Sequence, residues 1–375
     1  MGGSLVLFLV AVGVGSILAP DREFSANENR YLAEFPNISL DDILDCDFQD
    51  GLEEYLNDQI LGRDMWITIK TAIQKAVGDT DIGGAYVGKD GYDFEKITSD
   101  DVDEKLVQRN IAQIQKFFET CSKSIDSSRL SFLLVPTSGL ILADKLPDNA
   151  PLFDQASIIE DVQQSMMDYN FIDVRAVLLE NKEDGVYYRT DHHWTSLGAF
   201  LCYQQYASAS GLGEVSLKDY TVTMVTEEFR GSLYSKILDY DSAYDSIQFY
   251  EKTGSDASFV ITLDGEEAED FYQYDKLEEK DKYLFFFGGN YGEVVIERSD
   301  VNTSNERNLL LVKDSFANAF APFVAEDYDH VYMIDLRFFR GDMGAYMEEN
   351  NITDVLVLYN VSNFISDKNM HKLNK

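Results

Sequence analysis

Basic residues are scarce in this 375-residue sequence. The chain has 31 Lys and Arg against 67 Asp and Glu, so its formal net charge is −36, and the acidic residues are spread along its whole length. Such a chain repels phosphate backbones, which excludes nucleic acid as a partner. The acidic run DYDSAYD at 239–245 lacks the glycine and the final glutamate of an EF-hand loop, so it predicts no calcium site. The charge is best interpreted as a solvated surface.

Cysteine is also scarce, and repeats and low-complexity segments are missing. Cys46, Cys121 and Cys202 form an odd, widely spaced set without a CxxC motif. This pattern predicts neither a disulfide framework nor a zinc site, so we expect three ordinary buried or free thiols. The absence of repeats and biased segments excludes a solenoid and a largely disordered chain.

The amino-terminal segment contains no charged residue from Gly2 to Pro20. Its length is close to that needed to cross a bilayer, so residues 1–20 are predicted to be a membrane anchor or, alternatively, a cleaved signal segment. A buried core helix is the third alternative. In the first two cases the rest of the chain lies outside the cytoplasm. The basic flank that would fix the topology is missing.

Beyond this segment, the sequence predicts a linker over 21–46 and an α/β domain over 47–375. Helical periodicity over 47–77 allows apolar residues to share one face, namely Phe48, Leu52, Tyr55, Leu56, Ile60, Trp66, Ile69, Ile73 and Val77. A hairpin is expected over 84–96, around Lys89-Asp90-Gly91, and a helix over about 99–121.

Short apolar runs then alternate with helical segments at 154–168 and 195–209. The runs occupy 130–136, 171–174, 308–313, 330–335 and 354–359. This alternation is typical of an α/β domain with a mostly parallel sheet, in which ligands bind beyond the carboxyl ends of the strands. Residues from about 212 to 300 break the rhythm and predict a β-rich insertion.

Two of the four histidines are adjacent, in YRTDHHWT at 188–195. Asp191 and His193 are close enough for the carboxylate to fix the imidazole tautomer, which leaves the other ring nitrogen free to accept a proton. Thr195 is a suitable N-cap for the next helix, and Trp194 could wall the site. His330 precedes an apolar strand and His371 lies in a polar tail, so neither is the preferred base. A buried aromatic turn explains DHHW about as well.

Ser315 is the candidate nucleophile. It follows the apolar run NLLLVK and precedes small helix-forming residues, a strand–turn–helix pattern that aims backbone N–H groups at the strand end. The pattern is similar to a nucleophile elbow without the usual G-x-S-x-G spacing. A plain helix cap is the alternative interpretation of Ser315.

Several segments resemble the bacterial DHHW family, which is related to SGNH-hydrolase-like alginate O-acetyltransferases. The similar blocks are TDHHWTSLGAF, ENRYLAEFP, YLNDQILGRDMW, YVGKDGYDFE, FRGSLYSK, LLLVKDSFANAFAPF and YDHVYMIDLRFF. The resemblance implies a three-layer SGNH-hydrolase-like fold in which Asp191 orients His193, His193 is the base and Ser315 carries the acyl group. His192 stands at a variable position and is expected to bind substrate or stack.

The resemblance also indicates surrounding contacts. Arg337 is expected to contact substrate or an anion, and the Ser315 N–H to donate to the oxyanion. A second donor is expected from Asn318 or from the Gly288-Gly289-Asn290 turn. Ser138 stands where the acetyltransferases would have a lysine, so their substrate contacts transfer less well than the fold.

These observations favour an extracytoplasmic acyl (most simply acetyl) transferase or esterase that acts on cell-envelope glycan or exopolysaccharide without metal or cofactor. A transferase would need a membrane protein that supplies acyl groups. A non-catalytic envelope or carbohydrate-binding protein is the alternative. A metallohydrolase that uses Asp191, His192 and His193 is disfavoured, because neighbouring side chains usually diverge and no third histidine follows with suitable spacing.

Overall fold

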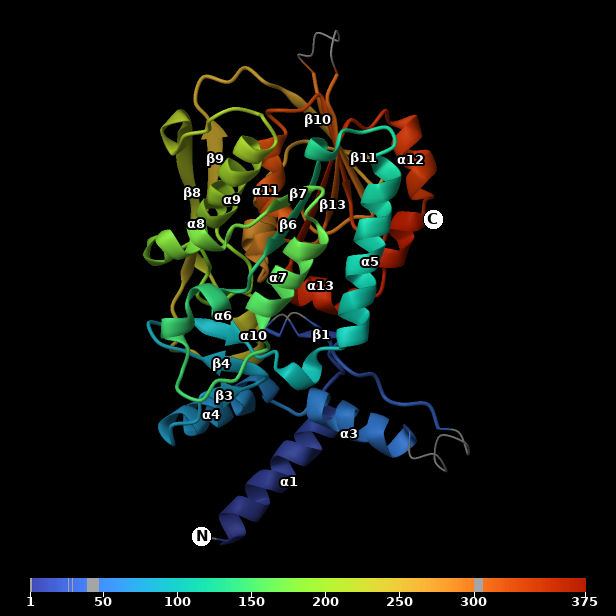
Figure 1. Ribbon diagram of the computed structural model, residues 1–375. Coiled ribbons are helices and arrows are strands. Elements are labelled where there is room, and N and C mark those ends of the chain that lie inside the picture. The colour runs from blue at the N-terminus through green and yellow to red at the C-terminus, as the bar shows by residue number, and fades with distance from the viewer. Residues whose placement is uncertain (1, 26, 29, 39–46, 300–305) are drawn as a thin grey trace.

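The computed structural model describes residues 2–25, 27–28, 30–38, 47–299 and 306–375 (Figure 1). Its centre is an eight-stranded sheet with the order β11-β10-β12-β14-β13-β15-β6-β7. The strands are β6 (Leu130–Val135), β7 (Asn170–Ile172), β10 (Phe259–Leu263), β11 (Glu266–Ala268), β12 (Glu293–Arg298), β13 (Asn308–Lys313), β14 (His330–Ile334) and β15 (Asp354–Asn360).

The predicted parallel strands are confirmed. β14, β13, β15, β6 and β7 run parallel to one another, with Leu311 paired to Met333 on one side and to Leu356 on the other. Every residue of β13 is buried, because this strand lies inside the sheet and both of its faces are covered. The strand before Ser315 is therefore held on all sides.

The predicted β-rich region from 212 to 300 divides into two parts. β12, β10 and β11 extend the main sheet as antiparallel strands, starting from β14. β8 (Tyr220–Phe229) and β9 (Asp245–Lys252) form a separate ribbon, and helix α10 (Ser232–Ile237) lies between them in sequence. The region therefore differs from a self-contained insertion, because three of its five strands complete the main sheet.

Helices cover both faces of the sheet, which gives three layers. One core contains side chains of α8 (Arg175–Glu180), α9 (Ser196–Ala209) and α11 (Ala317–Val324). The other contains side chains of α5 (Glu104–Cys121), α7 (Gln155–Ser165), α12 (Met343–Glu349) and α13 (Val361–Ser366). Alternate residues of β13 point into the two cores, Leu309 and Leu311 into the first and Leu310 and Val312 into the second.

Several local predictions are confirmed by the structure. β4 (Ala85–Val87) and β5 (Asp93–Glu95) pair as the expected hairpin, to which β3 (Asp81–Ile82) adds a strand. Asp90 and Gly91 both have positive φ in the turn. Thr195 caps α9 by accepting a hydrogen bond from the Gly198 N–H. The short helix α6 (Ser138–Ile141) follows β6. Cys121 and Cys202 are buried free thiols, while Cys46 lies outside the described residues.

The described residues up to Val77 make up the N-terminal lobe. Its elements are α1 (Gly2–Leu18), the short pair β1 (Phe24–Ser25) and β2 (Arg30–Tyr31), α3 (Asp47–Gln59) and α4 (Arg63–Ala76). Gly62, with φ 71°, separates α3 from α4, so the periodic stretch 47–77 forms two helices. Several residues of the expected common face are exposed, among them Ile73 (60%) and Val77 (79%). Among the described residues no helix is long and apolar enough to span a membrane.

Candidate active site

Asp191, His193 and Ser315 lie in direct contact at the carboxyl end of β13. The Asp191 Oδ1–His193 Nδ1 distance is 2.6 Å, and the His193 Nε2–Ser315 Oγ distance is 2.7 Å. All three side chains are at most 9% exposed. The loop that carries Asp191 and His193 is closed at its base by a bridge between Tyr187 and Trp194. The structure thus joins residues that are 122 positions apart in sequence.

Asp191 is held by three hydrogen bonds and by close backbone packing. Its Oδ1 accepts from the backbone N–H and from Nδ1 of His193, and its Oδ2 accepts from the Ser232 N–H at 2.7 Å. A Cβ at Gly231 would come within 2.3 Å of the Asp191 side chain, so only glycine fits there. Burial opposes the charged carboxylate, but the two imidazoles and these hydrogen bonds outweigh it and lower the pKa of Asp191.

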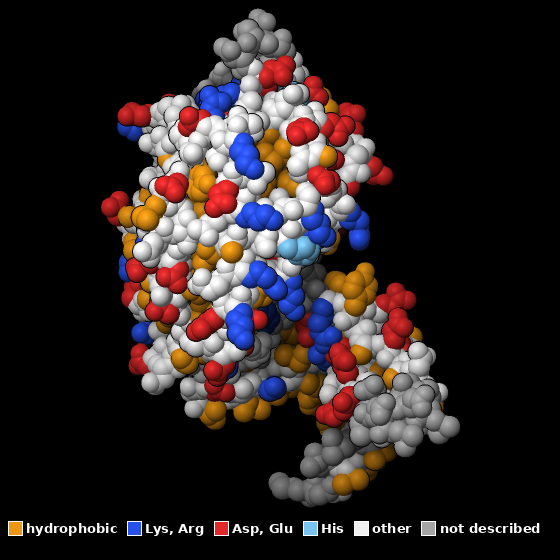
Figure 2. Space-filling model, turned by 45° about the vertical axis from the view of Figure 1, so that its right-hand side comes forward, with side chains coloured by type: hydrophobic (Ala, Val, Ile, Leu, Met, Phe, Trp, Pro, Cys, Tyr) orange, Lys and Arg blue, Asp and Glu red, His pale blue; other side chains and the backbone are white. Residues whose placement is uncertain are grey.

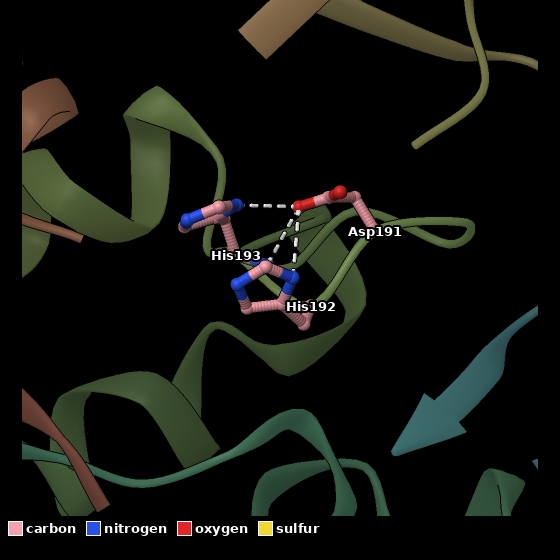
Figure 3. Close-up of side chains that lie close together, drawn as sticks. All are labelled: Asp191, His192 and His193. Atoms are coloured by element: carbon pink, nitrogen blue, oxygen red, sulfur yellow. Dashed lines mark hydrogen bonds and ion pairs between the residues drawn. The ribbon is translucent and has the colours of Figure 1, made fainter. Parts of the chain in front are cut away.

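His193 is stacked on Tyr283 and lies against the tilted ring of His192. Tyr283 lies on one face with ring centroids 3.8 Å apart and 9° between planes, and the centroid of His192 is 3.9 Å away. Figure 3 shows both imidazoles next to Asp191, each with its second ring nitrogen turned away from the carboxylate. Burial, followed by the neighbouring His192, lowers the pKa of His193 to about 4, although Asp191 opposes the shift. His193 is therefore neutral near pH 7 and able to accept a proton.

Asp314 fixes the turn that presents Ser315. Its Oδ1 accepts from the Phe316 N–H, and its Oδ2 accepts from the backbone N–H of Asn360 and from Nδ2 of Asn363. These bonds tie the turn to the end of β15, and α11 begins two residues after Ser315. The Tyr283 hydroxyl also donates to the Ser315 carbonyl at 3.1 Å. The predicted strand–turn–helix geometry around Ser315 is confirmed.

The candidate oxyanion donors differ in whether they already make a hydrogen bond within the protein. Lys313, which is 1% exposed, donates to Oδ1 of both Asn290 and Asn318, and the Asn318 amide donates to the Gly289 carbonyl. The Asn318 side chain is therefore occupied as a brace. The backbone N–H groups of Ser315, Gly289 and Asn290 make no hydrogen bond to another described residue, which leaves them free to donate.

The other predicted residues lie around this centre in different ways. His192 is part-buried and its Nδ1 is 2.7 Å from Ser232 Oγ. Trp194 is fully buried and donates to the Phe316 carbonyl, so it supports the serine turn from the interior and does not face solvent. Arg337 forms a fork with the buried Asp335 and, together with Asp314, lines a polar cavity of about 280 Å³.

Asp191, His192 and His193 also place potential metal-ligand atoms within 4.8 Å of one another. Both ring nitrogens of His193 are already engaged, however, Nδ1 with Asp191 and Nε2 with Ser315. A metal bound by His193 would have to replace one of these two hydrogen bonds. The donor set therefore fits a proton-transfer site better than a metal centre.

Sequence reasoning missed Tyr283, Ser232 and Lys313. Tyr283 lies in a run of aromatic residues that shows no periodic signal, and its stacking on His193 depends on a contact between distant segments. Ser232 falls within the quoted block FRGSLYSK, but nothing local shows that its N–H reaches Asp191. Lys313 stands in an apolar strand, and a cation inside such a strand is the one signal that could have identified it.

The fold is similar to that of two solved proteins. A DHHW family protein from Eubacterium siraeum has a TM-score of 0.64 at 22% identity, covering 78% of this chain and 95% of its own. Bacillus cereus PatB1, also solved with a sulfonyl adduct, has a TM-score of 0.62 at 23–24% identity, covering 76% of this chain and 97–99% of its own. A search of curated proteins finds no match. A family model for DHHW proteins matches residues 83–334, more than half of the chain, and the chain therefore belongs to the DHHW family.

Proposed function

We propose that this protein is an extracytoplasmic serine-dependent acyltransferase or esterase with an SGNH-hydrolase-like fold, acting on envelope glycan or exopolysaccharide. The single observation that carries the proposal is the chain of contacts from Asp191 through His193 to the Ser315 hydroxyl, at 2.6 Å and 2.7 Å. A carboxylate, an imidazole and a hydroxyl in this order form the arrangement that activates serine for attack on an ester.

The reaction proceeds in two steps. Ser315 Oγ attacks the ester carbonyl and transfers its proton to His193 Nε2, and the leaving alcohol departs with that proton as the acyl–serine ester forms. A sugar hydroxyl or water then attacks this ester and gives its proton to His193, and Ser315 Oγ regains that proton as the acyl group leaves. Asp191 stabilises the imidazolium in both steps without itself accepting the proton.

The tetrahedral intermediates require hydrogen-bond donors near Ser315. Its own N–H, with the N–H of Gly289 or Asn290, is our candidate set, and Lys313 and Asn318 brace the turn that contains Asn290. These amides belong to a fixed turn, so little reorganisation is needed as charge develops.

The surroundings of the site provide the substrate contacts in this proposal. In this proposal His192, which is part-buried beside His193, and Arg337, which lines the polar cavity with Asp314, bind the acceptor glycan. The sequence resemblance to alginate O-acetyltransferases supports an acetyl group and a glycan substrate. A transferase of this kind requires a membrane protein that supplies acyl groups from the cytoplasm, and the N-terminal segment would keep the chain at the membrane.

A serine-directed probe tests the proposal. A fluorophosphonate or an aryl sulfonyl fluoride is expected to form a covalent adduct at Ser315, located by peptide mass spectrometry. Ser315→Ala should abolish the adduct. Ser165→Ala should not, because Ser165 lies at the end of α7, where its hydroxyl donates to the Asp161 carbonyl. Labelling should persist in strong chelator, which separates this site from a metallohydrolase.

The alternative is a non-catalytic envelope or carbohydrate-binding protein that retains the same fold. Intact protein that binds glycan but forms no adduct with either probe, and hydrolyses no acetyl ester, would favour that alternative and overturn the proposed chemistry.

A further inference from the structure

The N-terminal lobe exposes most of the apolar surface of the molecule. Among the described residues 28 large hydrophobic side chains are exposed, and 18 of them lie between Val6 and Val77, in about a fifth of the chain. The other ten are scattered from Met167 to Phe338. Figure 2 shows hydrophobic side chains along the lower edge of the molecule, where the lobe lies. Contiguous apolar patches of this kind mark interaction sites on soluble proteins.

Helix α4 has two opposed faces. Met65, Ile69, Ile73 and Val77 recur every four residues and are 53%, 43%, 60% and 79% exposed. The other face holds the helix to the catalytic domain, where the buried Thr71 hydroxyl donates to the Ile237 carbonyl at 2.6 Å and Lys75 pairs with Asp239. α4 is thus an amphipathic helix whose polar side is occupied and whose apolar side is free.

Helix α1 continues the same surface. It has no charged residue, and its ring contact with α4 joins Phe8 and Trp66 at 5.8 Å. The Leu61 N–H donates to Ser16 Oγ at 2.8 Å, which fixes the other end of α1 next to the start of α4. The exposed side chains of α1, together with Leu61, Met65, Ile69, Ile73 and Val77, are called here the apolar platform.

We propose that the apolar platform binds a lipid bilayer at its interface. The exposed side chains of α1 include Val6, Leu7, Phe8, Val10 and Val14, which point to different sides of the helix. A protein partner would cover one side only, whereas acyl chains can surround the helix. Its 17 residues measure about 26 Å at 1.5 Å per residue, and its uncharged surface suits insertion among acyl chains, while the amphipathic α4 suits the interface.

The platform also fixes the direction in which the active site faces. α10 contacts α4, and its first residue, Ser232, donates to Asp191. In Figure 1, α10, α13 and the N-terminal lobe all lie at the end of the sheet where the parallel strands finish. A bilayer on the platform would therefore hold the Ser315 end of the sheet next to the membrane surface. The functional meaning of this orientation rests on the proposed function, since it matters only if an acyl donor resides in the membrane. Lipid binding by the apolar platform does not rest on the proposed function.

Vesicle flotation of the full chain tests the proposal. We expect the protein to float with phosphatidylcholine vesicles, and the triple variant Ile69→Ser/Ile73→Ser/Val77→Ser to lose at least about tenfold in vesicle affinity because apolar burial is removed. The control is Met167→Ser/Val222→Ser/Met224→Ser, which changes three equally exposed apolar residues outside the lobe and should float like the parent. Near-identical circular dichroism and melting temperature would show that both triple variants fold.

Three outcomes would overturn the proposal: no flotation of the parent chain, equal flotation of both triple variants, or self-association without vesicles that the α4 triple variant abolishes. The last would identify a second copy of the chain as the occupant. Ser315→Ala should float like the parent, so failure of lipid binding and failure of the proposed catalysis remain distinguishable.

Discussion

Aromatic and aliphatic side chains serve opposite purposes in two neighbouring regions of this protein. Around Ser315, Trp194, Phe316 and Tyr283 are at most 5% exposed, and their rings pack on the imidazole or on the serine turn. In the N-terminal lobe, residues of the same chemical kind, such as Ile73 and Val77, are mostly exposed. Near Ser315 the apolar groups are buried and pack on the imidazole and the serine turn, whereas in the lobe they remain exposed.

The difference shows that apolar periodicity alone does not identify a core. α4 and α5 both carry an apolar stripe, yet α5 buries Ile114, Phe117 and Phe118 against the sheet while α4 leaves its stripe uncovered. What distinguishes them is the next layer of structure, which exists for α5 and is missing for α4 among the described residues. Helical periodicity identifies the apolar face of a helix but not whether another part of the protein covers that face.

The largest loss of the proposed activity is expected when Asp191 loses its charge. Asp191→Asn would keep the shape but favour the wrong His193 tautomer, so ester turnover should fall by roughly 10⁴-fold. Hydrolysis of p-nitrophenyl acetate measures this loss. Asp144→Asn is the control, since Asp144 only pairs with Lys182 at the surface, and it should remain within about twofold of the parent. Equal loss in both variants, or none in Asp191→Asn, would contradict the assignment.

The core beneath the site should be the costliest place to remove apolar volume. Leu311 is fully buried in β13, so Leu311→Ala should lower the free energy of unfolding by about 2–5 kcal/mol. Urea unfolding monitored by tryptophan fluorescence measures the change. A cost below about 1 kcal/mol would mean that β13 is less tightly packed than the structure indicates.

Gly231 is the tightest backbone contact at Asp191, and a methyl group there should affect stability and activity together. Gly231→Ala is expected to cost about 1–3 kcal/mol through overpacking and to reduce turnover by displacing Asp191. Gly344→Ala is the matched control, because its Cβ would meet the nearest atom at an ordinary 3.5 Å. Normal activity in Gly231→Ala would show that the Asp191 carboxylate can relocate without loss.

The sequence was sufficient to predict the parallel strands, the cap at Thr195 and the turn at Ser315, because each depends on local pattern or on the rule that parallel strands end at one edge. It also paired Asp191 with His193, which are only two residues apart. Tyr283 and Ser232 could not be predicted, since each reaches the site from a distant segment whose local sequence carries no matching signal.

The same reasoning explains two incomplete predictions, one in the N-terminal lobe and one beside Ser315. The break at Gly62 requires a left-handed backbone conformation. Glycine allows this conformation but also fits within a helix, so 47–77 was predicted as one periodic stretch. Asn318 was a candidate oxyanion donor until its amide proved to be occupied by Lys313 and Gly289. Contacts of this kind are set by tertiary packing and leave no trace in spacing.

The pH dependence of labelling should report the buried state of His193. A probe adduct requires neutral His193, whose pKa is lowered to about 4 by burial and then by His192. Labelling should therefore fall only as the pH drops well below 6.5, and more than half of the maximal rate should remain at pH 5.5. An imidazole with the ordinary pKa would retain about a tenth of the maximal labelling rate at pH 5.5.

His192→Phe keeps an aromatic neighbour of His193 but removes the charge of His192, so the fall in labelling at acidic pH should move to higher pH. Labelling of the parent that falls to half at pH 6.5 or above would contradict a His193 pKa lowered by burial.

The smallest effect on the free energy of unfolding is expected from substitutions on the exposed stripe of α4. Ile73 is 60% exposed, so Ile73→Ser should change the free energy of unfolding in water by no more than about 0.5 kcal/mol, against several for Leu311→Ala. Adding phosphatidylcholine vesicles should separate parent from variant, because only the parent gains the full stabilisation that a bound partner confers on the folded state. Measuring both melting temperatures with and without vesicles checks this. A large loss in water alone would mean that Ile73 is covered within the protein itself, and the contrast between the two regions would then disappear.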